Sequence, residues 1–374
     1  MNDETIPPPA AKRALLHRLV LPWWTILFPL LGVPAVLLSL AKMGTGGTIA
    51  ATVILIGSVL AAVHHAEVVA HRVGEPFGTL VLAVAVTVIE VSLIVSLMLS
   101  DAGDASTLAR DTVFAAIMII LNFIVGLCLL AGGIRHGEQR FTLRGVSATL
   151  CVLAAMAVLS LILPNYTATT PGPTYAPSQL IFVAVVSLIL YGTFVMVQTV
   201  RHRDYFLPSG EQLPADAHAD APSDTAAWSA FGVLLVALVA VVLLAKDLSA
   251  TVETAILEAG LPLALVGVII AALVLAPESL AAYRAAKRNR LQTSLNLALG
   301  SALATIGLTI PAVAIVSLVL DLPLALGISA KSMTLLALSL FVSTLSLGTG
   351  KTTVLQGVVH LVIFAVYLFV TVVP

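Results

Sequence analysis

The chain has 374 residues, of which 59% are hydrophobic and only 10% are charged, and its formal net charge is −1. Soluble domains carry about 25% charged residues, so this composition excludes a water-soluble globular enzyme and an intrinsically disordered chain. The near-zero net charge offers no basic field for phosphates and argues against nucleic-acid binding. We therefore predict an all-α polytopic membrane protein whose main partner is the lipid bilayer.

The apolar runs predict the spans, because a membrane helix needs about 20 consecutive apolar residues. A polar, basic tail (1–18) precedes the first run, which is too long for a signal-peptide core. The sequence predicts eleven spans: 19–41, 48–71, 77–99, 112–133, 143–163, 179–200, 228–245, 261–282, 295–320, 332–347 and 353–373. No loop between them is long enough to form a second domain.

The Lys and Arg residues predict the orientation of these spans. With the N-terminus inside, fourteen of them fall in cytoplasmic segments and four on the opposite side. Cytoplasmic loops carry the excess of positive charge. We therefore expect a cytoplasmic N-terminus and an external C-terminus.

A polar segment, 201–225, interrupts the apolar pattern and is expected to be a cytoplasmic linker. It carries five carboxylates among Ala and Pro residues: Asp204, Glu211, Asp216, Asp220 and Asp224. These residues are either a plain linker or a regulatory cation antenna, since clustered negative charge concentrates cations. Five spans lie on each side of the linker, in 48–200 and 226–374. An odd number of spans per repeat forces two repeats into opposite orientations, so an inverted repeat is expected.

Each predicted repeat carries one acidic residue in its second span, Glu90 in VTVIEVSLI and Glu278 in LVLAPESLA. A charge at the bilayer centre costs about 2.5–3.5 kcal/mol on insertion scales. Because no Lys or Arg lies mid-span to pair with them, cations or protons are the expected partners. The alternative is a protonated glutamate hydrogen-bonded to a neighbouring helix.

Pro277 precedes the second of these glutamates. Proline removes a backbone donor and disfavours helix in the preceding residue, so the carbonyls of Leu273 and Val274 are expected to lose helical partners. Free carbonyls beside a carboxylate would form an all-oxygen site suited to Na⁺ or Ca²⁺. The alternative is a simple proline kink.

Further polar side chains within the spans are candidates for the same site. Thr87, Asn122 and Ser301 are candidate ligands, although such residues more often form helix–helix hydrogen bonds. His64, His65 and Glu67 are a candidate proton relay or metal site, or simply the polar end of a helix. Gly350-Lys351-Thr352 matches the end of a P-loop, but the preceding motif glycine is absent. We therefore expect no nucleotide and an ion gradient as the energy source.

Several of these stretches resemble the cation/proton exchangers of the calcium/cation antiporter superfamily, specifically bacterial ChaA-type Ca²⁺(Na⁺, K⁺)/H⁺ antiporters. The resemblance covers nearly the whole chain after residue 20 and is carried by three stretches: HHAEVVAHRVGEPFGTLVLAVAVTVIEVSLI, NFIVGLCLLAGGIRHGEQRF and APESLAAYRAAKRNRLQTSLNLALGSALATIGLTIP. The family's GNATE and GNAAE patterns are replaced by residues 86–90 and 274–278, and the Ser usually four residues before Asn122 is Met118. Fewer side-chain oxygens therefore remain around the glutamates.

The resemblance implies a secondary antiporter, not an enzyme, in the bacterial inner membrane. It would exchange cytoplasmic Ca²⁺, or Na⁺ or K⁺, for external protons at Glu90 and Glu278, without a resident cofactor and with a homo-oligomer left open. Two alternatives remain at this point. A cation channel would need a continuous polar path through the spans, and an intramembrane metal-dependent enzyme would need a metal cluster or a nucleophile.

Overall fold

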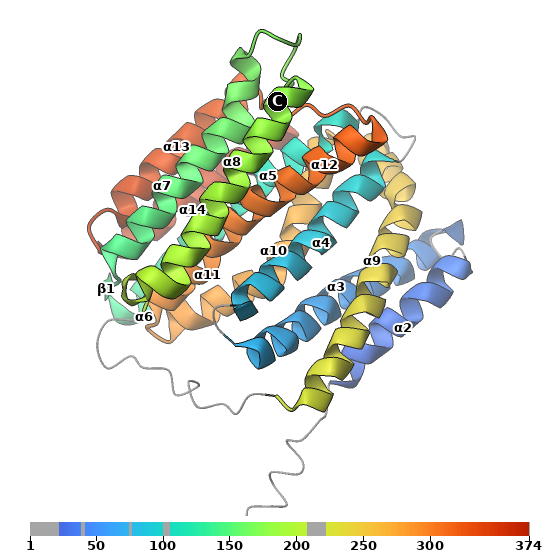
Figure 1. Cartoon of the computed structure of the whole chain (residues 1–374), viewed down its shortest axis with the longest axis horizontal. Helices are drawn as coiled ribbons and strands as arrows, with labels where there is room; N and C mark the ends of the chain where they lie inside the picture. Colours follow the sequence, from blue (N-terminus) through green and yellow to red (C-terminus); the bar gives the residue numbers. More distant parts are fainter. Residues whose placement is uncertain (1–21, 39–41, 75–76, 100–104, 208–221, 374) are drawn as a thin grey trace, which may run out of the picture.

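The computed structural model describes residues 22–38, 42–74, 77–99, 105–207 and 222–373. The regular elements of this part of the chain are helices, joined by loops such as 167–176 and 322–329, and one antiparallel pairing of two short strands, β1 (Gln139–Arg140) and β2 (Lys351–Thr352). Lipid supplies no hydrogen-bond partners, so each spanning segment satisfies its backbone groups within its own helix. The long apolar runs therefore form a bundle of elongated helices (Figure 1).

The helices are described in two halves, separated by residues 208–221. The first half contains α2 (Trp23–Leu37), α3 (Thr45–Val73), α4 (Phe77–Met98), α5 (Leu108–Met118), α6 (Val125–His136), α7 (Leu143–Ala157) and α8 (Pro177–Met196). The second half contains α9 (Asp224–Glu258), α10 (Ala264–Lys287), α11 (Leu291–Ala304), α12 (Ile310–Leu320), α13 (Ala330–Leu347) and α14 (Val354–Val372). Short π-helical turns at Ile119–Ile124 and Thr305–Thr309 join α5 to α6 and α11 to α12. Further π-helical turns follow α7 and α8, and short 3₁₀ turns lie at Ala105–Thr107, Leu163–Tyr166 and Arg203–Tyr205.

Nine helical runs among the described residues are long and apolar enough to cross a membrane. Two shorter apolar helices, Trp23–Leu37 and Val81–Ser96, lie within the predicted spans 19–41 and 77–99. The multi-span helical architecture predicted from the sequence is therefore confirmed. Helix α9 runs 35 residues to Glu258, beyond the predicted span 228–245, and the apolar run within it that could cross a membrane is Asp224–Leu248. The charged residues that follow residue 245 continue the helix and do not break it.

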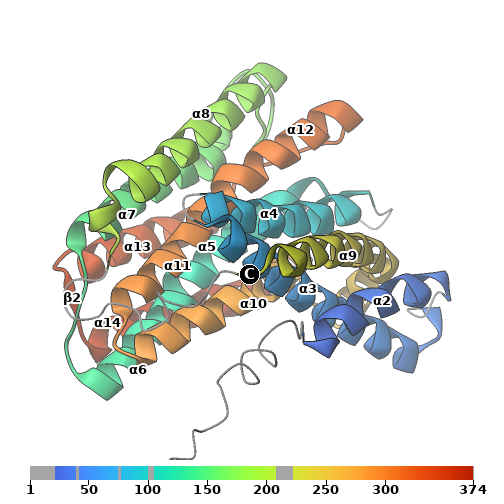
Figure 2. The same cartoon turned by 60° about the horizontal axis from the view of Figure 1, so that its bottom comes forward.

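The helices form three groups across the bundle (Figures 1 and 2). Helix α2 packs against α3 and α9 at one side, and α4 contacts both α3 and α9. Helices α7 and α13 pack together at the opposite side, where α8 lies beside α12. Between them, α5 and α6 pack against α10, and α10 packs against α11. The centre of the bundle is thus shared by both halves of the chain.

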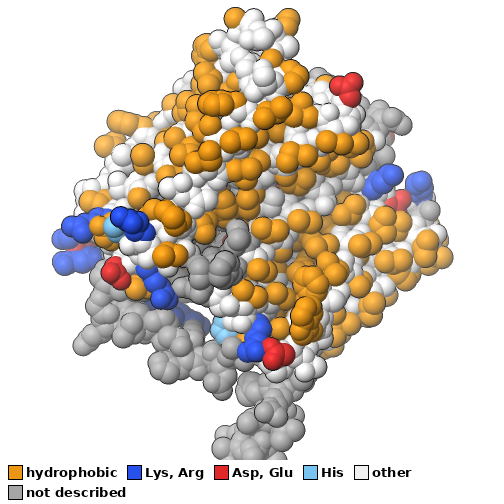
Figure 3. All heavy atoms as spheres, in the orientation of Figure 1, with side chains coloured by type: hydrophobic (Ala, Val, Ile, Leu, Met, Phe, Trp, Pro, Cys, Tyr) orange, Lys and Arg blue, Asp and Glu red, His pale blue; other side chains and the backbone are white. Residues whose placement is uncertain are grey.

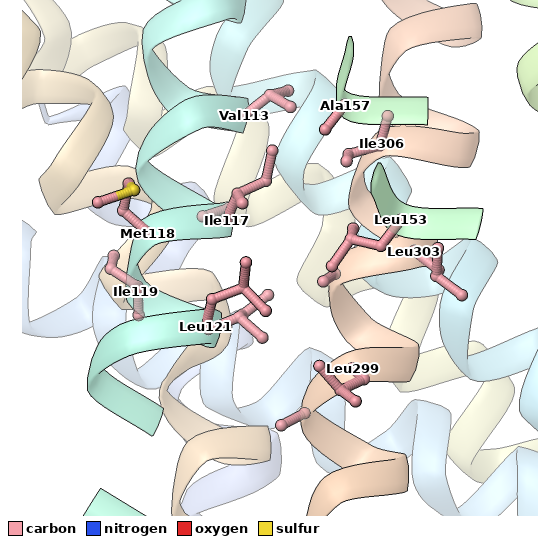
Figure 4. Close-up of a cluster of buried hydrophobic side chains, with 14 of the residues drawn as sticks. Val113, Ile117, Met118, Ile119, Leu121, Leu153, Ala157, Leu299, Leu303 and Ile306 are labelled. Carbon is pink, nitrogen blue, oxygen red and sulfur yellow. The ribbon is translucent and has the colours of Figure 1, made fainter. Parts of the chain in front are cut away.

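Among the membrane-crossing runs of the described residues, Leu108–His136 is the most enclosed, with 83% of its most apolar stretch buried. Figure 4 shows Ile117 and Leu121 of this run facing a cluster formed by Leu153 of α7 and by Leu299 and Leu303 of α11. The outer surface is apolar as well. In Figure 3 hydrophobic side chains cover most of the visible face, and Lys and Arg gather at its margins. Since lipid tails are apolar, this distribution suits a bundle whose sides face a bilayer.

Candidate cation-binding site

Glu90 lies on α4 in the interior of the protein, with 2% of its surface exposed. The hydroxyl of Thr309 donates a hydrogen bond of 2.9 Å to its Oε2. Thr305, one turn earlier, lies close enough to interact with the same carboxyl group. The other oxygen, Oε1, is buried without a hydrogen-bond partner among the described residues. Burying a carboxyl oxygen without a partner is costly, so this oxygen can accept a proton or bind a cation.

Glu278 lies on α10 and is less enclosed than Glu90, being only half-buried. The hydroxyl of Ser301 on α11 donates a hydrogen bond of 2.5 Å to its Oε2. Helices α4 and α10 contact each other, so the two glutamates lie on neighbouring helices. Within the described residues neither carboxyl forms an ion pair with Lys, Arg or His. The structure thus brings together two carboxyl groups from opposite halves of the sequence.

Two π-helical turns lie beside this pair of glutamates. Thr305–Thr309 contacts α4, and Ile119–Ile124 contacts α10, so each glutamate helix packs against the π-helical turn of the other half. A π-helical turn adds one residue to a helix, disturbs its hydrogen-bond ladder, and often occurs at functional sites. Here the first of these turns delivers the Thr309 hydroxyl to Glu90.

Asn122 lies in the other π-helical turn and is fully buried. Its amide nitrogen donates to the hydroxyl of Ser339 on α13 at 2.9 Å. Its Oδ1 has no hydrogen-bond partner among the described residues. The side chain therefore holds one free carbonyl-type oxygen in a turn that packs on the helix of Glu278.

The hydroxyl of Thr87 does not bind Glu90. It donates to the carbonyl oxygen of Ala83 in its own helix, at 2.8 Å, which is a common arrangement for a helical threonine. The expected role of Thr87 as a ligand is not supported by this contact.

The expected unwinding before Pro277 is not observed. Helix α10 runs without interruption from Ala264 to Lys287 with the proline inside it. A proline removes only the hydrogen bond to the carbonyl four residues earlier, here that of Leu273, and neighbouring helices in a bundle compensate for such a loss. The proposed reason for the Val274 carbonyl to act as a ligand is therefore wrong, because α10 is continuous through Pro277.

The rings of His64 and His65 lie against each other, with centroids 5.6 Å apart, and each ring also contacts α2. His65 is fully buried and its Nε2 lies 3.2 Å from the carbonyl oxygen of Thr25, so it fastens α3 to α2. The ring of His64 lies against that of Trp24 on α2. Glu67 instead interacts electrostatically with Glu278. Among the described residues no group of three His, Cys, Asp or Glu side chains is placed to hold a metal ion.

The linker carboxylates fall partly outside the described residues. Glu211, Asp216 and Asp220 lie outside them. Asp204 is in a short 3₁₀ turn, and Asp224 opens α9 and forms an exposed ion pair with Arg72 at the end of α3. This ion pair joins the two halves at the end of the bundle predicted to be cytoplasmic.

Comparison with known proteins identifies the family. The model of the sodium/calcium exchanger protein family matches residues 43–200 and 229–373. The chain is 48% identical to the ionic transporter y4hA of Sinorhizobium fredii, over 94% of this chain and 97% of that protein. It is 36% identical to the sodium-potassium/proton antiporter ChaA of Escherichia coli, over 84% of this chain and 85% of that one.

Solved structures share the fold. The native YfkE structure superposes with a TM-score of 0.71 at 17% identity, covering 94% of this chain and all of that one. An H⁺/Ca²⁺ exchanger named CAX superposes with a TM-score of 0.69 at 16% identity, covering 93% and 88%. The chain belongs to the sodium/calcium exchanger protein family, and it is a multi-pass membrane transporter of the antiporter type, not an enzyme.

Proposed function

We propose that this protein exchanges cytoplasmic Ca²⁺, or alternatively Na⁺ or K⁺, for external protons, and that Glu90 and Glu278 bind the two kinds of ion in turn. The observation that supports this proposal is the carboxyl pair on the neighbouring helices α4 and α10. The two groups come from opposite halves, each accepts a hydroxyl hydrogen bond, and neither is neutralised by a basic side chain within the described residues.

The mechanism follows from charge balance in a dry site. When both glutamates are ionised, a dehydrated Ca²⁺ balances both of their charges, whereas Na⁺ or K⁺ balances only one. When both are protonated, the site is neutral and releases the cation. The empty, doubly ionised site is costly, because two like charges repel strongly where water is scarce. The site therefore changes sides carrying either a cation or protons, which couples the two fluxes.

The oxygen atoms available to a cation suit a hard ion. Besides the four carboxyl oxygens, Thr309 and Ser301 supply hydroxyls at the two glutamates, and Asn122 holds a free Oδ1 in the neighbouring turn. Ca²⁺ takes six to eight oxygen ligands. The related proteins carry names for both ion classes, a sodium-potassium/proton antiporter and a Ca²⁺/H⁺ antiporter of Aphanothece halophytica. The ion is therefore best decided by direct competition in one assay.

The domain organisation and topology belong to the same proposal. Two five-helix repeats, 48–200 and 226–374, would lie in opposite orientations around the glutamates, after a first helix within 19–41. Two observations support this: the family model matches two segments of the chain, and each half has a π-helical turn in the span that follows its glutamate. The protein would lie in a bacterial inner membrane with its N-terminus in the cytoplasm and its C-terminus outside.

The test is cation-dependent proton flux in proteoliposomes, scanned over Ca²⁺, Na⁺ and K⁺. Glu90→Gln and Glu278→Gln should each abolish exchange, because Gln keeps the volume but supplies neither the charge nor the exchangeable proton. Glu138→Gln is the matched control, since Glu138 lies outside the spans and pairs with Arg140 and Lys351. Near-normal flux in either glutamate variant, at normal expression, would remove that residue from the mechanism. An antiporter, unlike a channel, reverses its cation flux when the pH gradient alone is reversed.

A further inference from the structure

A basic cavity lies at the ends of α6 and α10, apart from the paired glutamates. It has a volume of about 590 Å³ and is lined by the following residues: Arg135, His136, Leu280, Tyr283, Arg284, Lys287 and Arg288. Four of these carry a permanent positive charge, and no Asp or Glu is among them. The size falls within the range of about 300–1,000 Å³ typical of ligand pockets.

Within the described part of the chain, no carboxylate neutralises these four cations. None of them forms an ion pair with a described residue. The acidic residue nearest in sequence, Glu138, is engaged by Arg140 and Lys351 on the other side of its loop. Lys287 instead lies over the ring of Tyr283, at 5.4 Å. Among the described residues, the cavity therefore concentrates positive charge that has no carboxylate partner.

Helix geometry explains only part of this concentration. Basic residues in the last turn of a helix interact favourably with its dipole, and both α6 and α10 end here. However, the ring of His136 hydrogen-bonds the carbonyl of Lys287 at 3.0 Å. This contact holds the two helix ends together and brings two basic clusters into one cavity, against their mutual repulsion.

The border of the cavity is apolar. Leu280 on α10 is 47% exposed, and Ile134, next to Arg135 on α6, is 71% exposed. Tyr283 is half-buried between the apolar and the charged parts. Aromatic and basic residues typically mark the headgroup level of a membrane. At the headgroup level of a membrane, the cavity would present its cations to lipid phosphates and its apolar border to acyl chains.

We propose that this cavity binds the headgroup of an anionic phospholipid, with Arg135, Arg284, Lys287 and Arg288 around its phosphate. Basic pockets between membrane helices on the cytoplasmic side bind such headgroups. Arg284 lies six residues after Glu278 on the same helix, which is about 9 Å along its axis. A bound headgroup therefore contacts the helix that carries the second glutamate, although binding itself does not depend on the transport mechanism.

The test measures binding of phosphatidylglycerol to the purified full-length protein by native mass spectrometry, with phosphatidylcholine as the neutral comparison. In the double variant Arg284→Gln/Lys287→Gln the affinity for phosphatidylglycerol should fall about 30-fold, because each cation near the membrane surface contributes roughly fivefold. Arg140→Gln/Lys351→Gln is the matched control, because it removes two charges from the same end of the bundle outside the cavity, and it should change affinity less than twofold. Arg135→Gln/Arg288→Gln repeats the test from both helices should the first variant fold poorly.

Three results would overturn the proposal. One is unchanged phosphatidylglycerol binding in both cavity variants. Another is an equal loss in the control, which would show that only the general surface charge attracts lipid. The third is full displacement of the lipid by inorganic phosphate at millimolar concentration, which would identify a site for a soluble anion.

Discussion

The Thr309 hydroxyl offers a sharp test of the geometry around Glu90. In Thr309→Val the side chain keeps its shape but loses the hydrogen bond of 2.9 Å to Oε2. A hydrogen bond to a charged group is worth about 1.5–3 kcal/mol, or roughly 10- to 150-fold in affinity. Because Thr305 interacts with the same carboxyl and compensates in part, we expect the lower end, about a tenfold loss of apparent cation affinity.

Thr87→Val is the matched control for this experiment. Thr87 lies one turn from Glu90 on α4, but its hydroxyl is bonded to the carbonyl of Ala83 within the helix. The same chemical change there should alter apparent affinity less than twofold. Both variants are measured as cation-dependent proton flux in proteoliposomes, with maximal flux reporting whether exchange itself survives. An equal loss in the two variants, or a larger loss in Thr87→Val, would refute the placement of Thr309 at the site.

Three further predictions concern other parts of the chain. Ser301→Ala should weaken the apparent cation affinity roughly tenfold or more but spare the flux at saturating cation, because the Ser301 hydroxyl donates a hydrogen bond of 2.5 Å to Glu278. An unchanged affinity would show that Ser301 is only a packing residue. If the linker is a cation antenna, replacing its five carboxylates, Asp204, Glu211, Asp216, Asp220 and Asp224, by Asn or Gln should raise the apparent cation KM at low ionic strength. The rise should be much smaller near 0.15 M salt, where the Debye length is about 8 Å. An unaltered KM at low salt would show that the segment is a plain linker. Burial raises the pKa of Tyr175, which lies between two spans, from 10.0 to about 12. The unfolded chain therefore loses this proton first, and the stability of the folded protein falls as the pH rises through that window. Thermal unfolding in detergent should show a smaller loss of stability between pH 9.5 and 11 in Tyr175→Phe than in the native protein.

The architecture was predictable from the sequence, and the two glutamates stood out as candidates, for a simple physical reason. Long apolar runs are unmistakable when 59% of the chain is hydrophobic, and a carboxylate within such a run is costly enough to be functional by default. Ser301 was also a candidate from the sequence, and the structure places it on Glu278.

Thr309 could not be assigned to Glu90 from the sequence, because the two residues are 219 positions apart and lie in opposite halves. Which face of a span meets another span depends on packing, and a π-helical turn shifts that face by a residue in a way that apolar periodicity does not reveal. The same limitation explains the error at Pro277. Local preference predicts a broken helix there, whereas neighbouring helices support a continuous one.

The unequal burial of the two glutamates suggests an order of events within the proposed mechanism. Glu90 is 2% exposed, whereas Glu278 is half-buried and interacts with Glu67 of α3, toward the predicted cytoplasmic end of that helix. A cation arriving from the cytoplasm would therefore meet the field of Glu67, then the carboxyl of Glu278, and only then Glu90 with its unpartnered Oε1. In the proposed mechanism the more exposed Glu278 would then exchange its proton with water before the buried Glu90 does. Proton release and cation entry would share one path, as coupled exchange requires.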